Sequence, residues 1–283
     1  MRGYLLGLYE KAMPGALSLN EKLAETKNAG FDFMEISIDE SDEKLSRLKW
    51  TSAERHEIKA LVESTETPIA TMCLSGHRKY PIGSLDPRVR ERGLEIMVDA
   101  VDLAFDLGVR IIQLAGYDEY YNPSTAETRR LFSENLRRCV YLASRKGIIL
   151  AFETMETPFM NTVAKAMDHV RAVDSPYLQV YPDLGNITNA AIADGRSVDD
   201  DLESGRGHIA AMHLKETKPG IFRDMDFGTG HVDFSGGARK AASLGVRLFV
   251  GEFWHVDVSD WRSRISGAGR FLRQVLDSCF EKD

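Results

Sequence analysis

The sequence predicts an α/β protein of the (β/α)₈ TIM barrel class, formed by residues 1–283 as a single domain. Eight short apolar runs alternate with segments of helical periodicity along the 283 residues. The runs are continuous, which is typical of parallel strands buried on both faces. No Gly-x-Gly-x-x-Gly loop follows any run, so a doubly wound sheet is the less favoured alternative. Barrels of this class reach about 250 residues as one domain, and no linker divides this chain.

The first four strand–helix units are predicted from apolar runs and helix-end signals. We expect strands at residues 4–9, 31–38, 68–74 and 109–114. The first helix, 18–28, starts at Ser18 with Glu21 at capping-box spacing and ends before Gly30. Helices at 52–64 and 124–146 follow the second and fourth strands. The long helix 87–107 has Pro87 in its first turn and Gly108 after its end.

The last four units place a potential metal ligand at or near the end of each strand. Strand five ends at Glu153, strand six at Asp183 and strand eight at Glu252, while strand seven, 208–214, contains His213. These positions are 30, 30 and 39 residues apart, about one strand-plus-helix unit each time. The expected helices are 161–173, an irregular helical stretch 186–204, 234–244 and 259–280. In such barrels the active site lies at the carboxyl ends of the strands, so the four side chains are expected to converge.

Charge and composition exclude several classes of protein. The formal net charge of −7 and the absence of a basic run argue against a nucleic-acid partner. No stretch approaches the roughly 20 apolar residues of a membrane span, and the first residues are too short in their apolar part for a signal peptide. Cys73, Cys139 and Cys279 are too far apart for a disulfide framework or a close-spaced zinc motif. We therefore expect a cytoplasmic protein without a membrane partner.

Three carboxylates and one imidazole form an oxygen-rich ligand set. Such a set favours one divalent ion, Mn²⁺, Mg²⁺, Co²⁺ or Zn²⁺, and excludes a thiolate zinc site. Close carboxylates also resist joint ionisation unless a cation is present. Two glutamates at one metal suggest proton transfer beside a carbonyl, with Glu153 and Glu252 as the acid/base pair. The alternatives are an aldose–ketose isomerase, a DNA-repair type phosphodiesterase and a non-catalytic sugar-phosphate sensor. The phosphodiesterase is disfavoured because such sites use more histidines, and the sensor because all four ligand positions are filled.

Several segments make the chain resemble the L-ribulose-5-phosphate 3-epimerase family, also called L-xylulose-5-phosphate 3-epimerase. The matching segments, in chain order, are GLYEKA (7–12), FDFME (31–35), MCLS (72–75), GLEIM (93–97), IIQLAGYD (111–118), YPDLGN (181–186) and KPG (218–220). The resemblance implies a xylose-isomerase-like barrel that binds its metal through Glu153, Asp183, His213 and Glu252. It also implies epimerisation at C3 of a ketopentose 5-phosphate, and a homodimer.

Substrate contacts are expected from five further residues. Asn186 stands where the epimerases of unphosphorylated ketoses carry a histidine, which favours a phosphorylated sugar and leaves a free ketose as the alternative. Lys218, beside the Pro219–Gly220 turn, is one expected phosphate anchor. Arg78 is its rival, because a planar guanidinium binds phosphate oxygens in pairs. His77 and Glu10 follow strands three and one at the same end of the barrel.

Overall fold

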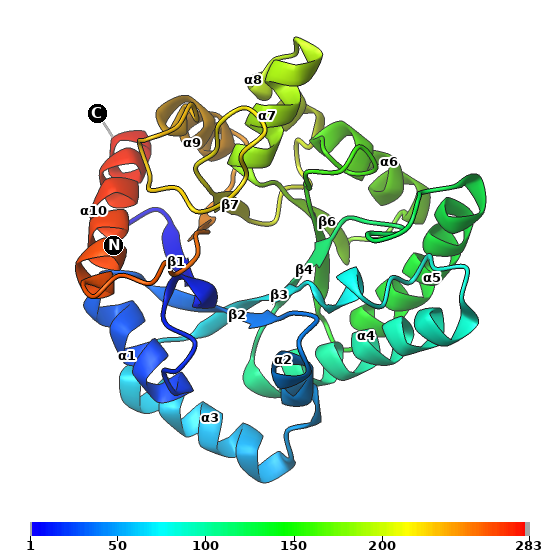
Figure 1. The fold of residues 1–283 in the computed structure, drawn as a ribbon, viewed down its shortest axis with the longest axis horizontal. Coiled ribbons are helices and arrows are strands. Elements are labelled where there is room, and N and C mark those ends of the chain that lie inside the picture. Colours follow the sequence, from blue (N-terminus) through cyan, green and yellow to red (C-terminus); the bar gives the residue numbers. More distant parts are fainter. Residues whose placement is uncertain (1, 281–283) are drawn as a thin grey trace.

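Eight parallel strands form the centre of the computed structural model, which describes residues 2–280 (Figure 1). They are β1 (Leu5–Tyr9), β2 (Phe33–Ile38), β3 (Ile69–Leu74), β4 (Ile111–Ala115), β5 (Ile149–Glu153), β6 (Leu178–Tyr181), β7 (Met212–Leu214) and β8 (Leu248–Gly251). Each strand except β6 pairs with the next in sequence, and β1 also pairs with β8. Between β6 and β7 the barrel is joined by two parallel bridges, Val180 with Ile209 and Asp183 with His213. The predicted (β/α)₈ barrel is confirmed.

The helices surround the strands on the outside (Figure 1). They are α1 (Leu19–Asn28), α2 (Asp42–Ser46), α3 (Ser52–Thr65), α4 (Pro87–Leu107), α5 (Ala126–Ser144), α6 (Val163–Val173), α7 (Leu184–Asp194), α8 (Val198–Ser204), α9 (Phe234–Ser243) and α10 (Trp261–Phe280). Short 3₁₀ turns cover Glu10–Ala12, Arg47–Lys49 and Gly76–Arg78. The capping box of Ser18 with Glu21 and the position of Pro87 in the first turn of α4 are as predicted.

Three local differences from the sequence prediction have physical causes. The irregular stretch 186–204 is two helices, because Gly195 ends α7 in a left-handed conformation with φ of 62°. Helix α2 was not predicted, since its five residues are too few to show a period. Strand seven is shorter than expected, because residues 208–211 join the barrel through a single bridge at Ile209.

Two separate cores support the active end of the barrel. A large apolar core lies between strands and helices, and a smaller one fills the inside of the barrel. The inner core consists of Tyr9, Phe33, Cys73, Ala151, Tyr181, Ala211 and Val250. Gly7 leaves room for it, since a Cβ at that position would lie 2.3 Å from the ring of Phe33. This packed interior forms a rigid floor beneath the strand ends.

Within residues 2–280, no helix combines the length and the apolar character that crossing a membrane requires.

Candidate active site

Glu153, Asp183, His213 and Glu252 meet at the carboxyl end of the barrel, as their spacing predicted. One ligand atom from each side chain lies within 4.8 Å of the others. Glu153 is the last residue of β5, His213 is in β7, Asp183 lies two residues after the end of β6, and Glu252 follows β8 directly. All four are buried. Four consecutive strands of the barrel thus supply one polar group each to a single point.

Neighbouring groups fix the orientation of these four side chains. Asp183 is the N-cap of α7, and its Oδ1 accepts the backbone N–H of Asn186 at 2.6 Å. Glu153 accepts a short hydrogen bond from the amide of Gln113 on β4. The imidazole of His213 packs against the ring of Tyr181, with 4.7 Å between the centroids. Its Nδ1 lies 3.3 Å from Glu153 Oε1 and 3.3 Å from Glu252 Oε2.

Lys215 supplies a buried positive charge beside the carboxylates. Its Nζ lies 3.0 Å from Asp183 Oδ2 and 3.3 Å from Glu252 Oε2. Neither of these two oxygens accepts a hydrogen bond from a group among the described residues. Lys215 balances one negative charge, whereas three buried carboxyl groups converge here, so a further cation would stabilise them. The ligand set and these two oxygens fit a divalent metal ion held by Glu153, Asp183, His213 and Glu252.

Burial and mutual repulsion give the three carboxyl groups different acidities. Burial and the charge of Glu252 raise the pKa of Glu153. Burial likewise raises the pKa of Asp183 to about 8, although Lys215 opposes the shift. Burial also disfavours the charged form of Glu252, but Lys215 and His213 outweigh it and hold its pKa below the ordinary value. The pKa values of the two glutamates are therefore shifted in opposite directions.

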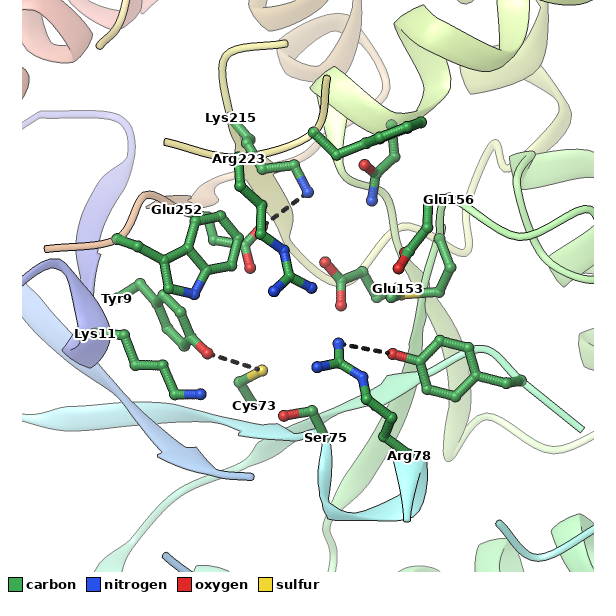
Figure 2. A pocket seen from close by; sticks show the side chains of 15 residues that line it. Tyr9, Lys11, Cys73, Ser75, Arg78, Glu153, Glu156, Lys215, Arg223 and Glu252 are labelled. Carbon is green, nitrogen blue, oxygen red and sulfur yellow. Dashed lines mark hydrogen bonds and ion pairs between the residues drawn. The ribbon is translucent and has the colours of Figure 1, made fainter. Parts of the chain in front are cut away.

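A pocket that is open to solvent lies above these residues. Figure 2 shows Glu153, Glu252 and Lys215 pointing into the same space as the cations Lys11, Arg78 and Arg223. The other lining residues are Tyr9, Cys73, Ser75, Tyr117, Met155, Glu156, Asn186, Phe222 and Trp254. The pocket thus combines a carboxylate-rich floor with four cationic side chains, those of Lys11, Arg78, Arg223 and Lys215, which suits a small anionic ligand.

Two of the five expected substrate-binding residues, Arg78 and Asn186, line this pocket. Arg78 Nη2 donates to the hydroxyl of Tyr117 at 3.3 Å, and the guanidinium carbon lies 4.6 Å from the centroid of the Tyr120 ring. Asn186 donates its amide to the carbonyl of Thr154 at 2.7 Å. Its Oδ1 is buried and has no hydrogen-bond donor among residues 2–280. Both side chains are therefore held in place with polar atoms still available.

Glu10 does not line the pocket, so the expectation that it contacts substrate is corrected. Its carboxylate is completely buried and accepts hydrogen bonds from Lys22 at 2.9 Å, Lys44 at 2.7 Å and Arg47 at 2.6 Å. Burial alone would raise the pKa of Glu10, but Arg47, Lys22 and Lys44 hold it well below the ordinary value. Glu10 was expected in the active site because it follows a strand, but it belongs to a structural ion cluster.

Replacing Glu10 by glutamine is expected to lower the free energy of unfolding by about 3–5 kcal/mol, because it leaves three enclosed cations without their anion. Chemical denaturation measures this change. Glu57→Gln, at an exposed position of α3, is the matched control and should change stability by less than about 0.5 kcal/mol. A loss for Glu10→Gln as small as the control's would contradict the structural role.

His77 and Lys218 also lie outside the pocket lining. His77 is buried, its Nε2 lies 3.0 Å from the carbonyl oxygen of Gly93, and burial lowers its pKa to about 4. Lys218 is exposed, and its backbone forms a bridge with Ile221. His77 therefore contacts the backbone of α4, and of the two expected anchors, Arg78 and Lys218, only Arg78 lines the pocket.

Several pocket residues were not selected from the sequence. Lys215 directly follows β7, so the rule that found the four ligands could have found it. Gln113, which donates to Glu153 from outside the pocket lining, is the third residue of β4. No sequence pattern predicted Arg223 as a pocket residue, because it lies in the long loop after β7. That loop is folded around Glu216, whose carboxylate accepts the backbone N–H groups of Thr217, Gly228 and Val232.

Fold and site together define a TIM barrel with a buried carboxylate–histidine cluster at its active end. A model of the xylose isomerase-like TIM barrel family matches residues 23–274. L-ribulose-5-phosphate 3-epimerase UlaE of Escherichia coli O139:H28 is 46% identical over 229 residues, which are 81% of this chain and 79% of that protein. The chain therefore belongs to the xylose isomerase-like TIM barrel family, and within it to the group of L-ribulose-5-phosphate 3-epimerases. This relationship confirms the prediction of an enzyme.

Solved structures show the same fold at low sequence identity. A D-psicose 3-epimerase from Clostridium cellulolyticum H10, solved with D-tagatose, is 17% identical, with a TM-score of 0.77 over 96% of this chain and 99% of that one. The 3-keto-D-glucoside 4-epimerase YcjR from E. coli is 19% identical, with a TM-score of 0.77 over 96% and 99%. These likenesses support the barrel assignment.

Proposed function

We propose that this protein is a sugar-phosphate 3-epimerase that interconverts L-ribulose 5-phosphate and L-xylulose 5-phosphate. The observation that carries the proposal is the pair Glu153 and Glu252. Each lies 3.3 Å from His213 Nδ1, and both line one pocket with four cationic side chains. The 46% identity to an enzyme named for this reaction supports the choice of substrate.

Epimerisation at C3 needs one group that removes a proton and another that returns it on the opposite face. Glu153 and Glu252 come from β5 and β8 and reach the same point from different sides of the site (Figure 2). Their pKa values are shifted in opposite directions, that of Glu153 upward and that of Glu252 downward. Two neighbouring carboxyl groups whose pKa values are shifted apart are typical of an acid and a base that act together. We infer that the carboxylate of Glu252 takes the C3 proton of one epimer and that Glu153 serves the other.

Removing the C3 proton leaves an enediolate across C2 and C3 of the sugar, and its charge must be stabilised. A divalent ion held by Glu153, Asp183, His213 and Glu252 would supply the electrophile for that charge. Lys215 adds a fixed positive charge on the side of Asp183 and Glu252. Gln113 holds Glu153 from the opposite side through its amide. These two neighbours keep both carboxylates directed at the reacting carbon.

The far end of the substrate would carry the phosphate towards the pocket cations. Arg78 is the best placed of them, because Tyr117 and the ring of Tyr120 hold its guanidinium and its buried Nε has no acceptor among the described residues. Lys11 is paired with Asp39, and Arg223 stacks on Trp254 at 5.1 Å from the ring centroid. The free Oδ1 of Asn186 can accept a sugar hydroxyl. The chemistry at C3 and the binding of the phosphate therefore use separate residues.

The substrate assignment is tested by measuring kcat/KM for L-ribulose 5-phosphate and for L-ribulose. We expect the wild-type enzyme to prefer the phosphorylated sugar. Arg78→Met should lower kcat/KM for that substrate by about 10–150-fold, the equivalent of a charged hydrogen bond of about 1.5–3 kcal/mol. The value for the free sugar should change little, because it has no phosphate for Arg78 to hold.

Lys218→Met is the matched control, because it removes a cation that lies outside the pocket lining. It should leave both values nearly unchanged. An equal loss for both substrates in Arg78→Met would remove Arg78 from phosphate binding, and a wild-type preference for the free ketose would refute the phosphorylated substrate.

A further inference from the structure

The inside of the barrel contains a carboxylate that the proposed reaction does not use. Glu35 is the third residue of β2 and is completely buried. Its Oε1 lies 2.7 Å from Nε2 of His213. Its Oε2 accepts hydrogen bonds from the hydroxyl of Thr71 at 2.7 Å and from that of Tyr181 at 3.0 Å. Thus residues of β2, β3, β6 and β7 form one network directly beneath the candidate metal site.

The two ends of the His213 ring have different surroundings. Nδ1 faces Glu153 and Glu252, at 3.3 Å from an oxygen of each. Nε2 faces Glu35 alone among the described residues. A neutral imidazole has one N–H donor and one acceptor nitrogen, and a hydrogen bond at one nitrogen decides which is which. The group that pairs with Nε2 therefore decides whether Nδ1 of the neutral ring carries a proton or a lone pair.

The contacts of Glu35 leave it one role towards this ring. A carboxylate only accepts hydrogen bonds, and its Oε2 already accepts from both hydroxyls. Oε1 must accept as well, so Nε2 of His213 carries a proton, and in the neutral imidazole Nδ1 then keeps its lone pair. A lone pair at Nδ1 is what a metal ion requires, and a carboxylate behind the ring makes the imidazole a stronger ligand.

We propose that Glu35 is a positioning residue, which holds His213 in the tautomer and orientation needed to bind the divalent ion. Thr71 and Tyr181 orient the Glu35 carboxylate from the other side. The sequence carries a faint signal for this role, since Glu35 is the one charged residue within the apolar run 33–38. The inference rests on the proposed metal site and goes beyond the four ligands.

The test is a titration of the metal-free protein with Co²⁺ in competition with a chromophoric chelator, without any sugar. Glu35→Gln is expected to weaken Co²⁺ binding by about 10–100-fold, the usual cost of losing an outer carboxylate. The amide can present either its oxygen or its NH₂ group to Nε2, so the tautomer is no longer imposed. Thr71→Val removes one donor to Glu35 and should weaken binding by a smaller factor. Because it is the milder change, it also tests the network if Glu35→Gln folds poorly.

Glu10→Gln is the matched control, because it also removes a buried carboxylate near a strand end but contacts none of the four ligands. It should lower stability and leave Co²⁺ affinity within about twofold. Nitrogen NMR of ¹⁵N-histidine protein loaded with Zn²⁺ should show His213 protonated at Nε2. Unchanged affinity in both Glu35→Gln and Thr71→Val, or an equal loss in Glu10→Gln, would overturn the inference. A wild-type protein that binds no Co²⁺ would instead refute the metal site itself.

Discussion

Glutamine at position 153 or 252 is expected to lower kcat for 3-epimerisation by at least about 10²–10⁴-fold, the contribution of a positioned general base. Glutamine keeps the shape of the side chain and can still offer an oxygen, but it cannot accept or release the proton. Both positions are buried and line the pocket. The substitution therefore removes the chemistry while preserving most of the packing, and the thermal unfolding temperature verifies that the fold survives.

Isotope exchange distinguishes the roles of the two glutamates. If Glu252 serves one epimer and Glu153 the other, each variant should still exchange the C3 proton of the epimer whose base remains. Conversion between epimers should be lost in both. Glu156→Gln is the matched control, because Glu156 lines the same pocket but lies outside the four-residue cluster. Near-normal conversion by Glu153→Gln or Glu252→Gln would remove that residue from the acid/base pair.

Removing divalent ions is the second change with a large expected effect. A chelator followed by gel filtration should reduce activity by more than about 10³-fold, because electrophilic stabilisation supplies several kcal/mol. A general base alone accounts for about 3–5 kcal/mol of a typical barrier reduction of about 8–23 kcal/mol. Adding back Mn²⁺, Mg²⁺, Co²⁺ or Zn²⁺ in turn should restore activity and identify the preferred ion.

Asp183→Asn provides an independent form of the same experiment. Asparagine can still cap α7, so the local helix should persist, while one anionic ligand is lost. We expect weaker metal binding and low activity that partly recovers at high metal concentration. Full activity in a sample shown by elemental analysis to be free of metal would falsify metal dependence.

The sequence predicted the barrel because each strand is a continuous apolar run and most helices carry their own end signals. Ser18, Pro87 and Gly108 marked helix boundaries that the structure reproduces closely. The four-residue cluster was also predictable, since parallel strands bring their carboxyl ends to one place. The short helix α2 and the break at Gly195 were missed, because both depend on a few residues of backbone conformation.

Substrate-binding residues were harder to predict from the sequence. A polar residue after a strand can face the pocket, as Arg78 does, or turn into the structure, as Glu10 and His77 do. Sequence position does not distinguish these cases, because the outcome depends on partners far away in the chain. Glu35 shows the same limit: its contact with His213 links residues 178 positions apart.

The nearest alternative reaction is aldose–ketose isomerisation at the same cluster, which would proceed through a 1,2-enediolate. Both reactions need a base and an electrophile beside a carbonyl, so the geometry of the four ligands suits either. The two reactions differ in which carbon-bound proton is removed.

Deuterium incorporation therefore tests the central claim most directly. L-ribulose 5-phosphate is incubated with the metal-loaded enzyme in D₂O and followed by proton and carbon NMR. We expect deuterium to enter at C3, L-xylulose 5-phosphate to form and C1 to stay unlabelled. Deuterium at C1 or C2 together with an aldose product, and no label at C3, would contradict it.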